Sequence, residues 1–159
     1  MKYYLFQIMY DRFPRAWRAM VNNCVAAQDY FPGIPWYLVN IQELEHLQKE
    51  DIVVAAFTKH RFAGYGTLIS NIREITPTTG DPFYGITSGG FPQRFDCEWV
   101  VIPPEKSQPF VDCSDLSKKY SIGLKHLHCL KEIDQSTFTV LQRRLSQAGA
   151  REACSHSNK

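Results

Sequence analysis

The chain has 159 residues, which is typical of one domain and long enough to bury a core without disulfides or metals. Its formal net charge of +2 argues against a strongly basic nucleic-acid clamp but leaves room for a local basic surface. Every apolar run is shorter than the roughly 20 residues of a membrane span, and the first residues do not resemble a signal peptide. Five cysteines in this context, with no C-x-x-C pair, predict reduced thiols and a cytoplasmic or nuclear protein.

The first third of the chain predicts a strand, a helix and an irregular segment. Residues 3–9 form a continuous apolar run that suits a central strand. Apolar side chains recur at helical spacing over residues 11–24, and Pro14 suits a first helical turn. Residues 25–40 are rich in aromatics and proline and predict irregular structure, and a short helix is expected over residues 40–51.

The middle of the chain predicts a hairpin, a long loop and another strand. Residues 51–57 and 62–70 form the hairpin, and the two glycines of its second strand indicate a bulge or a close backbone approach. The loop spans residues 71–93 and is rich in Gly, Pro, Ser and Thr. In residues 94–102 apolar and polar side chains alternate, which predicts a half-buried strand.

The last third predicts one short strand near residues 109–113, a last strand over residues 127–133 and a final helix. Asp134 is the expected N-cap of this helix and Gly149 its end. The resulting fold class is α+β, a small closed barrel of mostly antiparallel strands with helices outside. The chain is expected to form one domain over residues 1–148, followed by a flexible tail over residues 149–159.

Three segments resemble the YTH and EVE branch of the PUA-like superfamily. They are the aromatic first strand YYLFQI, the hairpin strand FAGYG from Phe62 to Gly66, and RFDCEWV from Arg94 to Val100 after a variable loop. Residues 127–145 resemble the final strand and helix of that family, so the resemblance extends over residues 1–148. It implies a PUA-like small β-barrel that reads modified bases. YTH proteins bind N6-methyladenine in RNA, and the N-terminal domains of McrBC-type restriction systems read modified bases in DNA.

The resemblance implies an aromatic pocket for one flipped, methylated base, with walls after the first helix and in the long loop. The matching positions are Trp36, Tyr37, Phe83, Tyr84 and Phe91. Stacking on such rings contributes about 1–3 kcal/mol per base, although each ring could instead pack on the core. Tyr10 and Asp11 follow the first strand, where relatives place groups that read the base edge. Asp11 could equally cap the first helix.

Basic residues near the hairpin turn and the long loop are the candidates for phosphate contacts, which supply most nucleic-acid affinity. They are Lys59, His60, Arg61, Arg73 and Arg94. A solvated turn is the alternative for each of them. His126 and His128 precede Cys129, but strand alternation separates the histidines from the thiol and no second motif exists, so no metal site is expected.

The sequence therefore predicts a non-catalytic reader of a modified base in RNA or DNA, with no cofactor, no membrane partner and no catalytic residue. The chain carries none of the common hydrolase, metalloprotease or phosphate-loop motifs. Two alternatives stay open: an RNA-binding PUA-like module that ignores modification, and a protein-interaction domain that has lost its pocket. The near-neutral charge favours the second alternative. The domain could form part of a larger multidomain protein.

Overall fold

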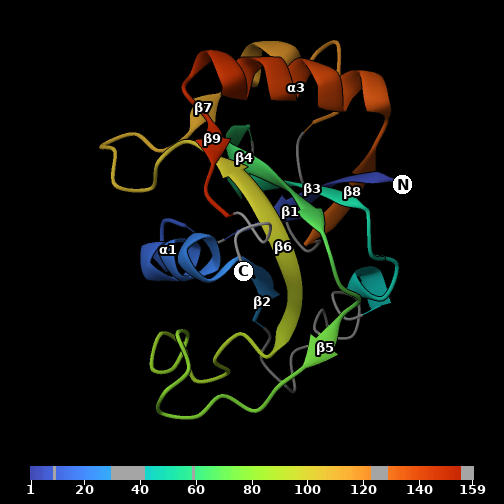
Figure 1. Ribbon diagram of the computed structural model, residues 1–159. Helices are drawn as coiled ribbons and strands as arrows, with labels where there is room; N and C mark the ends of the chain where they lie inside the picture. The colour runs from blue at the N-terminus through green and yellow to red at the C-terminus, as the bar shows by residue number, and fades with distance from the viewer. Residues whose placement is uncertain (9, 30–41, 59, 123–128, 155–159) are drawn as a thin grey trace.

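The computed structural model describes residues 1–8, 10–29, 42–58, 60–122 and 129–154 (Figure 1). Its elements, in chain order, are β1 (Tyr3–Gln7), α1 (Pro14–Asn23), β2 (Val25–Gln28), β3 (Ile52–Thr58), β4 (Arg61–Leu68), β5 (Arg73–Glu74), β6 (Gln93–Val101), β7 (Val111–Asp112), the 3-10 helix η1 (Ser114–Leu116), β8 (Leu130–Ile133), α3 (Gln135–Gln147) and β9 (Arg151–Glu152). A further helical turn lies at residues 42–44.

One mixed sheet forms the centre of the molecule. Its strand order is β2-β6-β4-β3-β1-β8, and the short strands β5 and β9 pair with β6 while β7 pairs with β4. β1 and β3 are parallel, whereas the other described pairs are antiparallel. Among the described strands β2 and β8 are separated by the central four and do not pair, so the sheet is open. The α+β class is confirmed, and the predicted closed barrel is wrong.

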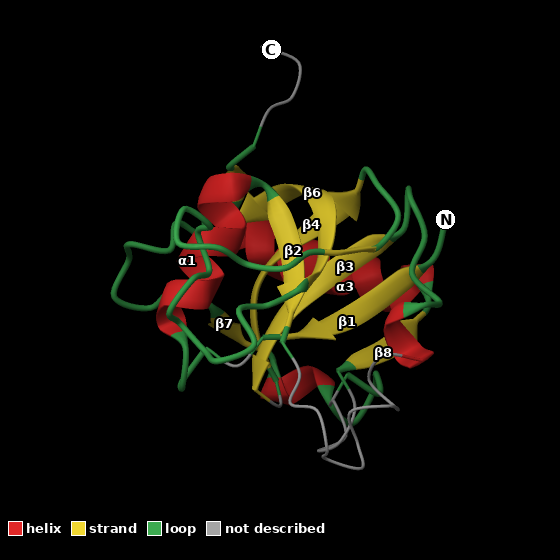
Figure 2. Ribbon diagram, turned by 90° about the horizontal axis from the view of Figure 1, so that it is seen from below, coloured by secondary structure: helices red, strands yellow, loops and turns green. Residues whose placement is uncertain are grey.

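The sheet is covered by one helix on each face (Figures 1 and 2). Tyr4 and Phe6 of β1 point to the face covered by α1, where they share a core with Trp17 and Met20. Leu5 points to the opposite face and joins the core that α3 covers. β3 alternates in the same way. Burial on both faces explains why these strands are continuous apolar runs rather than alternating ones.

Two of the three predicted helices are confirmed as α1 and α3, and their ends differ in chemistry. The short helix expected over residues 40–51 is wrong in its extent, because among the described residues only 42–44 are helical and 45–51 form turns and coil. The Asp134 carboxylate caps α3 by accepting a 2.7 Å hydrogen bond from the Thr137 amide, as the sequence predicts. Gly149 follows that helix at φ +92, a left-handed conformation that suits glycine. Pro14 opens α1, whose N-cap is Phe13 without a side-chain hydrogen bond, so Asp11 is not its cap.

β2 lies inside a segment that the sequence predicted as irregular, and that prediction is wrong for Val25–Gln28. These residues pair antiparallel with Gln93–Asp96 of β6. The Trp99 indole donates a 2.8 Å hydrogen bond to the Val25 carbonyl and fixes the strand from within the core. The strand has four residues, and most of its side chains are small. Its stability therefore depends on pairing with residues of β6 about 70 positions away in the sequence.

The end of the described chain is bound to the fold, which corrects two predictions. β9 pairs with β6, and the Ala153 amide donates to the Trp99 carbonyl at 2.9 Å. A disulfide joins Cys24 to Cys154, so residues 149–154 are not a flexible tail and these two thiols are not reduced. The remaining cysteines are buried free thiols, and burial raises the pKa of Cys97 well above its ordinary value.

In the described part of the chain no helix has the length and apolar character to span a membrane.

Candidate functional site

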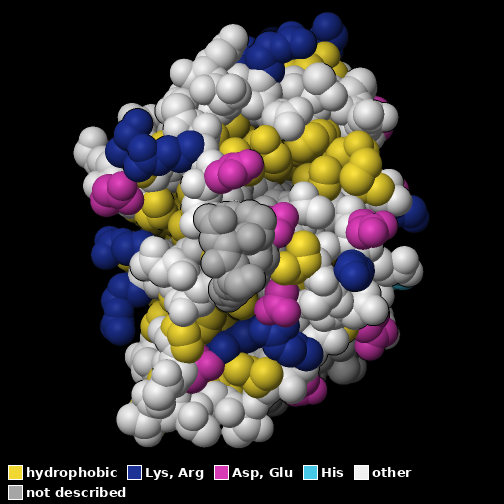
Figure 3. Space-filling view, viewed as in Figure 1, with side chains coloured by type: hydrophobic (Ala, Val, Ile, Leu, Met, Phe, Trp, Pro, Cys, Tyr) yellow, Lys and Arg dark blue, Asp and Glu magenta, His cyan; other side chains and the backbone are white. Residues whose placement is uncertain are grey.

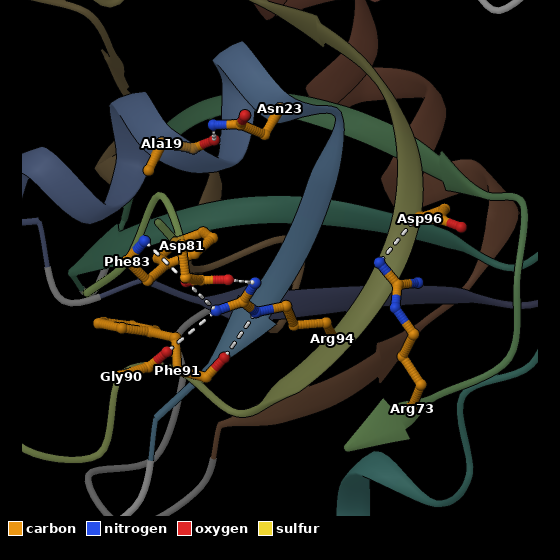
Figure 4. A network of polar contacts seen from close by, with 9 residues as sticks. All are labelled: Ala19, Asn23, Arg73, Asp81, Phe83, Gly90, Phe91, Arg94 and Asp96. Atoms are coloured by element: carbon orange, nitrogen blue, oxygen red, sulfur yellow. Dashed lines mark hydrogen bonds and ion pairs between the residues drawn. The ribbon is translucent and has the colours of Figure 1, made fainter. Parts of the chain in front are cut away.

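A buried ion pair organises the long loop before β6. The Arg94 guanidinium makes two 2.6 Å contacts with the Asp81 carboxylate, and the two side chains are only 6% and 12% exposed (Figure 4). Arg94 also donates to the carbonyls of Phe91 at 2.9 Å and Gly90 at 3.1 Å. The hydrogen bonds from Arg94 lower the pKa of Asp81. Arg94 thus closes the loop on itself and does not present its guanidinium to solvent for a phosphate contact, which corrects the sequence-based prediction for this residue.

Phe91 is held in a backbone conformation that residues other than glycine rarely adopt. Its φ is +53, which favours glycine and costs about 1 kcal/mol or more for other residues. The Phe91 amide donates to the Asp29 carboxylate at 3.2 Å, while its carbonyl accepts from Arg94. Its ring lies edge-on to Phe13 at 6.5 Å and tilted against Phe83 at 5.4 Å between centroids. Two charged side chains and two rings therefore fix one loop residue in place.

Asp29 lies beside this loop, and only one of its two carboxylate oxygens accepts a hydrogen bond from the described residues. Its Oδ1 accepts from the Phe91 amide, whereas its Oδ2 is buried and has no hydrogen-bond partner among the described residues. Next to it, Gln28 donates from its amide to the Gln7 carbonyl at 2.6 Å and ties the end of β2 to the end of β1. A buried acceptor without a partner costs about 1–3 kcal/mol, so it is rare unless function requires it. Sequence reasoning missed Asp29, and no pattern around it marks it.

The loop aromatics divide between core and surface. Phe83 is fully buried beneath Arg94, whose guanidinium lies 4.5 Å from the ring centroid, so Phe83 offers no free face for stacking. Tyr84 points outward and is 52% exposed. It lines a pocket of about 290 Å³ whose other walls come from the same loop. Those residues are Pro77, Gly85, Thr87, Ser88, Gly89 and Gly90.

Tyr10 and Asp11 are engaged within the protein. The Tyr10 ring stacks on Phe57 with 4.3 Å between centroids and nearly parallel planes. The Asp11 carboxylate accepts a 2.6 Å contact from Arg61, which also lies 4.9 Å from the centroid of the Phe110 ring. Asp11 therefore orders the hairpin turn against the end of β1. Whether either residue reads a base edge stays a prediction.

Among the described residues, the predicted candidates for phosphate contacts do not form one free basic surface. Arg73 forms a 2.8 Å ion pair with Asp96, and both side chains are 43% exposed. His60 is half-buried, and its Nδ1 is buried without a hydrogen-bond partner. Arg61 and Arg94 are paired as described above. Lys59 lies outside the described residues, and so do Trp36 and Tyr37, so their assignments stay sequence-based predictions.

Within the described ranges no group of three His, Cys, Asp or Glu side chains is arranged to hold a metal ion. Cys129 is buried, and its thiol lies 3.5 Å from the Glu43 carboxylate, which also accepts from the Cys129 amide. His126 and His128 fall outside the described residues.

Comparison with solved structures shows which known fold this chain resembles. No sequence profile of a known family matches the chain, and no curated protein matches it either. Among solved structures it is similar to the YTH domain of the Zygosaccharomyces rouxii MRB1 protein in complex with N6-methyladenosine RNA. The TM-score is 0.57 at 12% identity, over 94% of this chain and 89% of that one. It is also similar to Rpa0253 from Rhodopseudomonas palustris, with a TM-score of 0.46 at 11% identity over 92% and 94% of the two chains. The similarity to the MRB1 domain shows that the chain has a YTH-like fold.

Proposed function

We propose that this domain is a non-catalytic reader that binds one methylated base of a nucleic acid, with RNA as the first expected ligand. Support comes from the YTH-like fold, because the MRB1 domain of similar fold was solved with N6-methyladenosine RNA. Fold alone does not determine function, so the proposal rests on the site. The observation that carries it is Phe91, an aromatic residue held at φ +53 beside the unpaired Asp29 oxygen.

Each part of the site has a chemical role in this proposal. Tyr84 supplies an exposed ring on which a base can stack. The Asp29 Oδ2 is buried in the unbound protein; in this proposal entry of the base exposes it, and it then accepts a hydrogen bond from an exocyclic amino group, which both methylated adenine and methylated cytosine retain. The Arg94–Asp81 pair keeps the loop in one conformation, so little ordering cost falls on the binding step. These contacts offset the few kcal/mol that flipping a base out of a stack requires. Trp36 and Tyr37 are proposed as a further wall on sequence grounds.

Matched oligonucleotides test the proposal directly. Single-stranded RNA and DNA of one sequence, carrying N6-methyladenine, 5-methylcytosine or no modification, would be titrated by fluorescence anisotropy. We expect tighter binding of one methylated strand than of its unmodified counterpart. The DNA strands test the finer resemblance to EVE domains and McrBC-type reader domains. Equal affinity for all strands of one type would overturn base reading and indicate a module that ignores modification. Absence of binding would instead favour a protein-interaction domain.

Asp29→Asn tests the acceptor within the same panel. Asparagine keeps one oxygen for the Phe91 amide but replaces the second with an amino group that cannot accept. Loss of a hydrogen bond to a charged group is worth about 1.5–3 kcal/mol, or roughly 10- to 150-fold in affinity, and should fall on methylated and unmodified strands alike, because both carry the exocyclic amino group. Asp115→Asn is the matched control, since Asp115 is exposed and pairs with Arg144 away from this loop. An Asp29→Asn protein that binds these strands as tightly as the wild type does would remove Asp29 from the site.

A further inference from the structure

The exposed face of α1 carries arginines that the functional site has not accounted for. Ala16, Trp17, Met20 and Val21 face the core, while Arg15, Arg18 and Asn22 are exposed. Arg12 is exposed just before the helix, and its guanidinium lies 5.4 Å from the Phe13 ring centroid. We call Arg12, Arg15 and Arg18 the α1 basic stripe. In Figure 3 Lys and Arg atoms gather along the left edge of the molecule, where Figure 1 places α1.

The stripe has no carboxylate to neutralise it. Residues 12–28 contain three arginines and neither Asp nor Glu. No ion pair involves the stripe within the described part of the chain, although Arg61, Arg73, Arg94 and Arg144 are each paired with an aspartate. Asp11, which precedes the stripe in sequence, is held by Arg61.

The position of these arginines on the helix opposes stability rather than favouring it. The first turn of a helix prefers acidic side chains because the backbone dipole is positive there, and α1 has none. Arg15 is the second residue of α1, and Arg18 lies one turn further on the same face. Like charges three residues apart repel. A local rule broken without a compensating contact indicates a functional requirement.

The stripe begins at the loop already described. Arg12 lies over Phe13, and the Phe13 ring contacts Phe91 edge-on. From there α1 continues to Cys24, so the arginines extend from the aromatic loop along the helix. Arginine suits phosphate because its planar guanidinium donates two parallel hydrogen bonds to one phosphate group.

We propose that the α1 basic stripe binds the phosphates of the nucleic-acid strand on one side of the bound base. The class of ligand rests on the proposed function, whereas the surface itself is independent of base reading. Arg61, Arg73 and Arg94, three of the residues predicted from sequence for this role, are each paired with an aspartate, and the stripe adds arginines that no ion pair engages among the described residues. Binding through the stripe is insensitive to base identity and modification, because phosphate contacts carry no sequence information.

Arg15→Gln/Arg18→Gln tests the stripe, with Lys118→Gln/Arg143→Gln as a control. The control removes the same charge from exposed positions near α3. Affinity for methylated and unmodified single-stranded RNA would be measured across a range of salt concentrations. Each lost phosphate contact reduces the slope of log K against log salt by about 0.7, so the double variant should lose about 1.4 in slope and roughly 25-fold in affinity at 0.1 M salt. The ratio between methylated and unmodified RNA should not change.

The outcomes separate this proposal from the proposed function. Unchanged slope and affinity with intact discrimination would overturn the stripe and leave base reading standing. A reduced slope in a protein that does not discriminate would support the stripe and overturn base reading. Binding to vesicles of anionic lipid that depends on the stripe, with no binding to RNA, would overturn both. Thermal unfolding should show the double variant at least as stable as the wild type, since repulsion is removed, so weaker binding cannot be assigned to unfolding.

Discussion

Replacing Arg94 with Met should destabilise the protein more than any other single change at a charged residue described here. Methionine fills much of the same space but leaves the carbonyls of Gly90 and Phe91 without the Arg94 donor, and the Asp81 carboxylate keeps only its hydrogen bond from the Phe83 amide. Because both members of the ion pair are largely buried, removing one should cost about 3–5 kcal/mol at pH 7. Urea unfolding measures the global effect. If the loop opens on its own, hydrogen exchange over residues 81–91 reports the loss instead.

The loss of stability caused by Arg94→Met should also depend on pH. The pKa of Asp81 is lowered in the folded protein, from 3.8, by its hydrogen bonds with Arg94. A depressed carboxylate pKa contributes stability above the unfolded-state pKa, near 4, and this contribution is lost as the pH falls through the folded-state value. The difference in stability between wild type and Arg94→Met should therefore be largest at neutral pH and shrink as the pH falls below about 4.

Arg73→Met is the matched control for this prediction. Arg73, like Arg94, pairs with an aspartate. Its partner is Asp96 in β6, and both side chains of this pair are 43% exposed. Exposed pairs of this kind contribute at most about 1 kcal/mol. If Arg94→Met destabilised the protein no more than Arg73→Met, or if its effect did not change with pH, the buried pair would not be what holds the loop.

Three further predictions follow from the same structure. Gly66→Ala should cost about 1–3 kcal/mol in urea unfolding, because its Cβ would overlap the sulfur of the buried Cys97 in β6; Gly80→Ala, with nothing within 4 Å, should change stability little. Cys24→Ser/Cys154→Ser, or reduction of the wild type, should lower stability by about 2–5 kcal/mol because the bond closes a loop with a sequence separation of 130, and equal midpoints with and without reductant would contradict this. Tyr84→Ala should change the unfolding free energy by no more than about 0.5 kcal/mol, since the ring is half exposed; a larger loss would make Tyr84 a packing residue.

Much of the fold could be predicted because its signals are local. Two-sided burial makes β1 and β3 continuous apolar runs, and α3 carries its own cap at Asp134. The glycines of β4 were interpreted as a bulge or a close backbone approach: a Cβ on Gly64 would stand 2.5 Å from the Val100 carbonyl oxygen, and the β3–β4 register shifts beside Gly64. β2 and β9 could not be predicted in this way, because each is short and depends on pairing with distant β6. Sheet closure likewise depends on which strands meet at the edges, and hydrophobic periodicity does not encode that.

The site was less predictable than the fold for a related reason. Sequence marks Arg94 as basic and Phe83 as a loop aromatic, but their roles depend on burial and on Asp81, which reaches Arg94 from 13 residues earlier. Asp29 is defined by an empty hydrogen-bonding position, which exists only in the folded protein. The α1 basic stripe was visible in principle, because arginines at three-residue spacing with neither Asp nor Glu from residue 12 to residue 28 are a local pattern.

The Cys24–Cys154 bond has a mechanical consequence. It encloses everything from the end of α1 to β9 in one covalent ring, but β1 and α1 lie outside that ring. A force applied at the two ends of the chain would therefore stretch only the segment before Cys24 and the few residues after Cys154. β1 lies between β3 and β8 and is held there by hydrogen bonds and packing alone. Pulling would extract this strand while the ring limits further extension, so a single-molecule trace of the oxidised protein should show one short step, which lengthens on reduction.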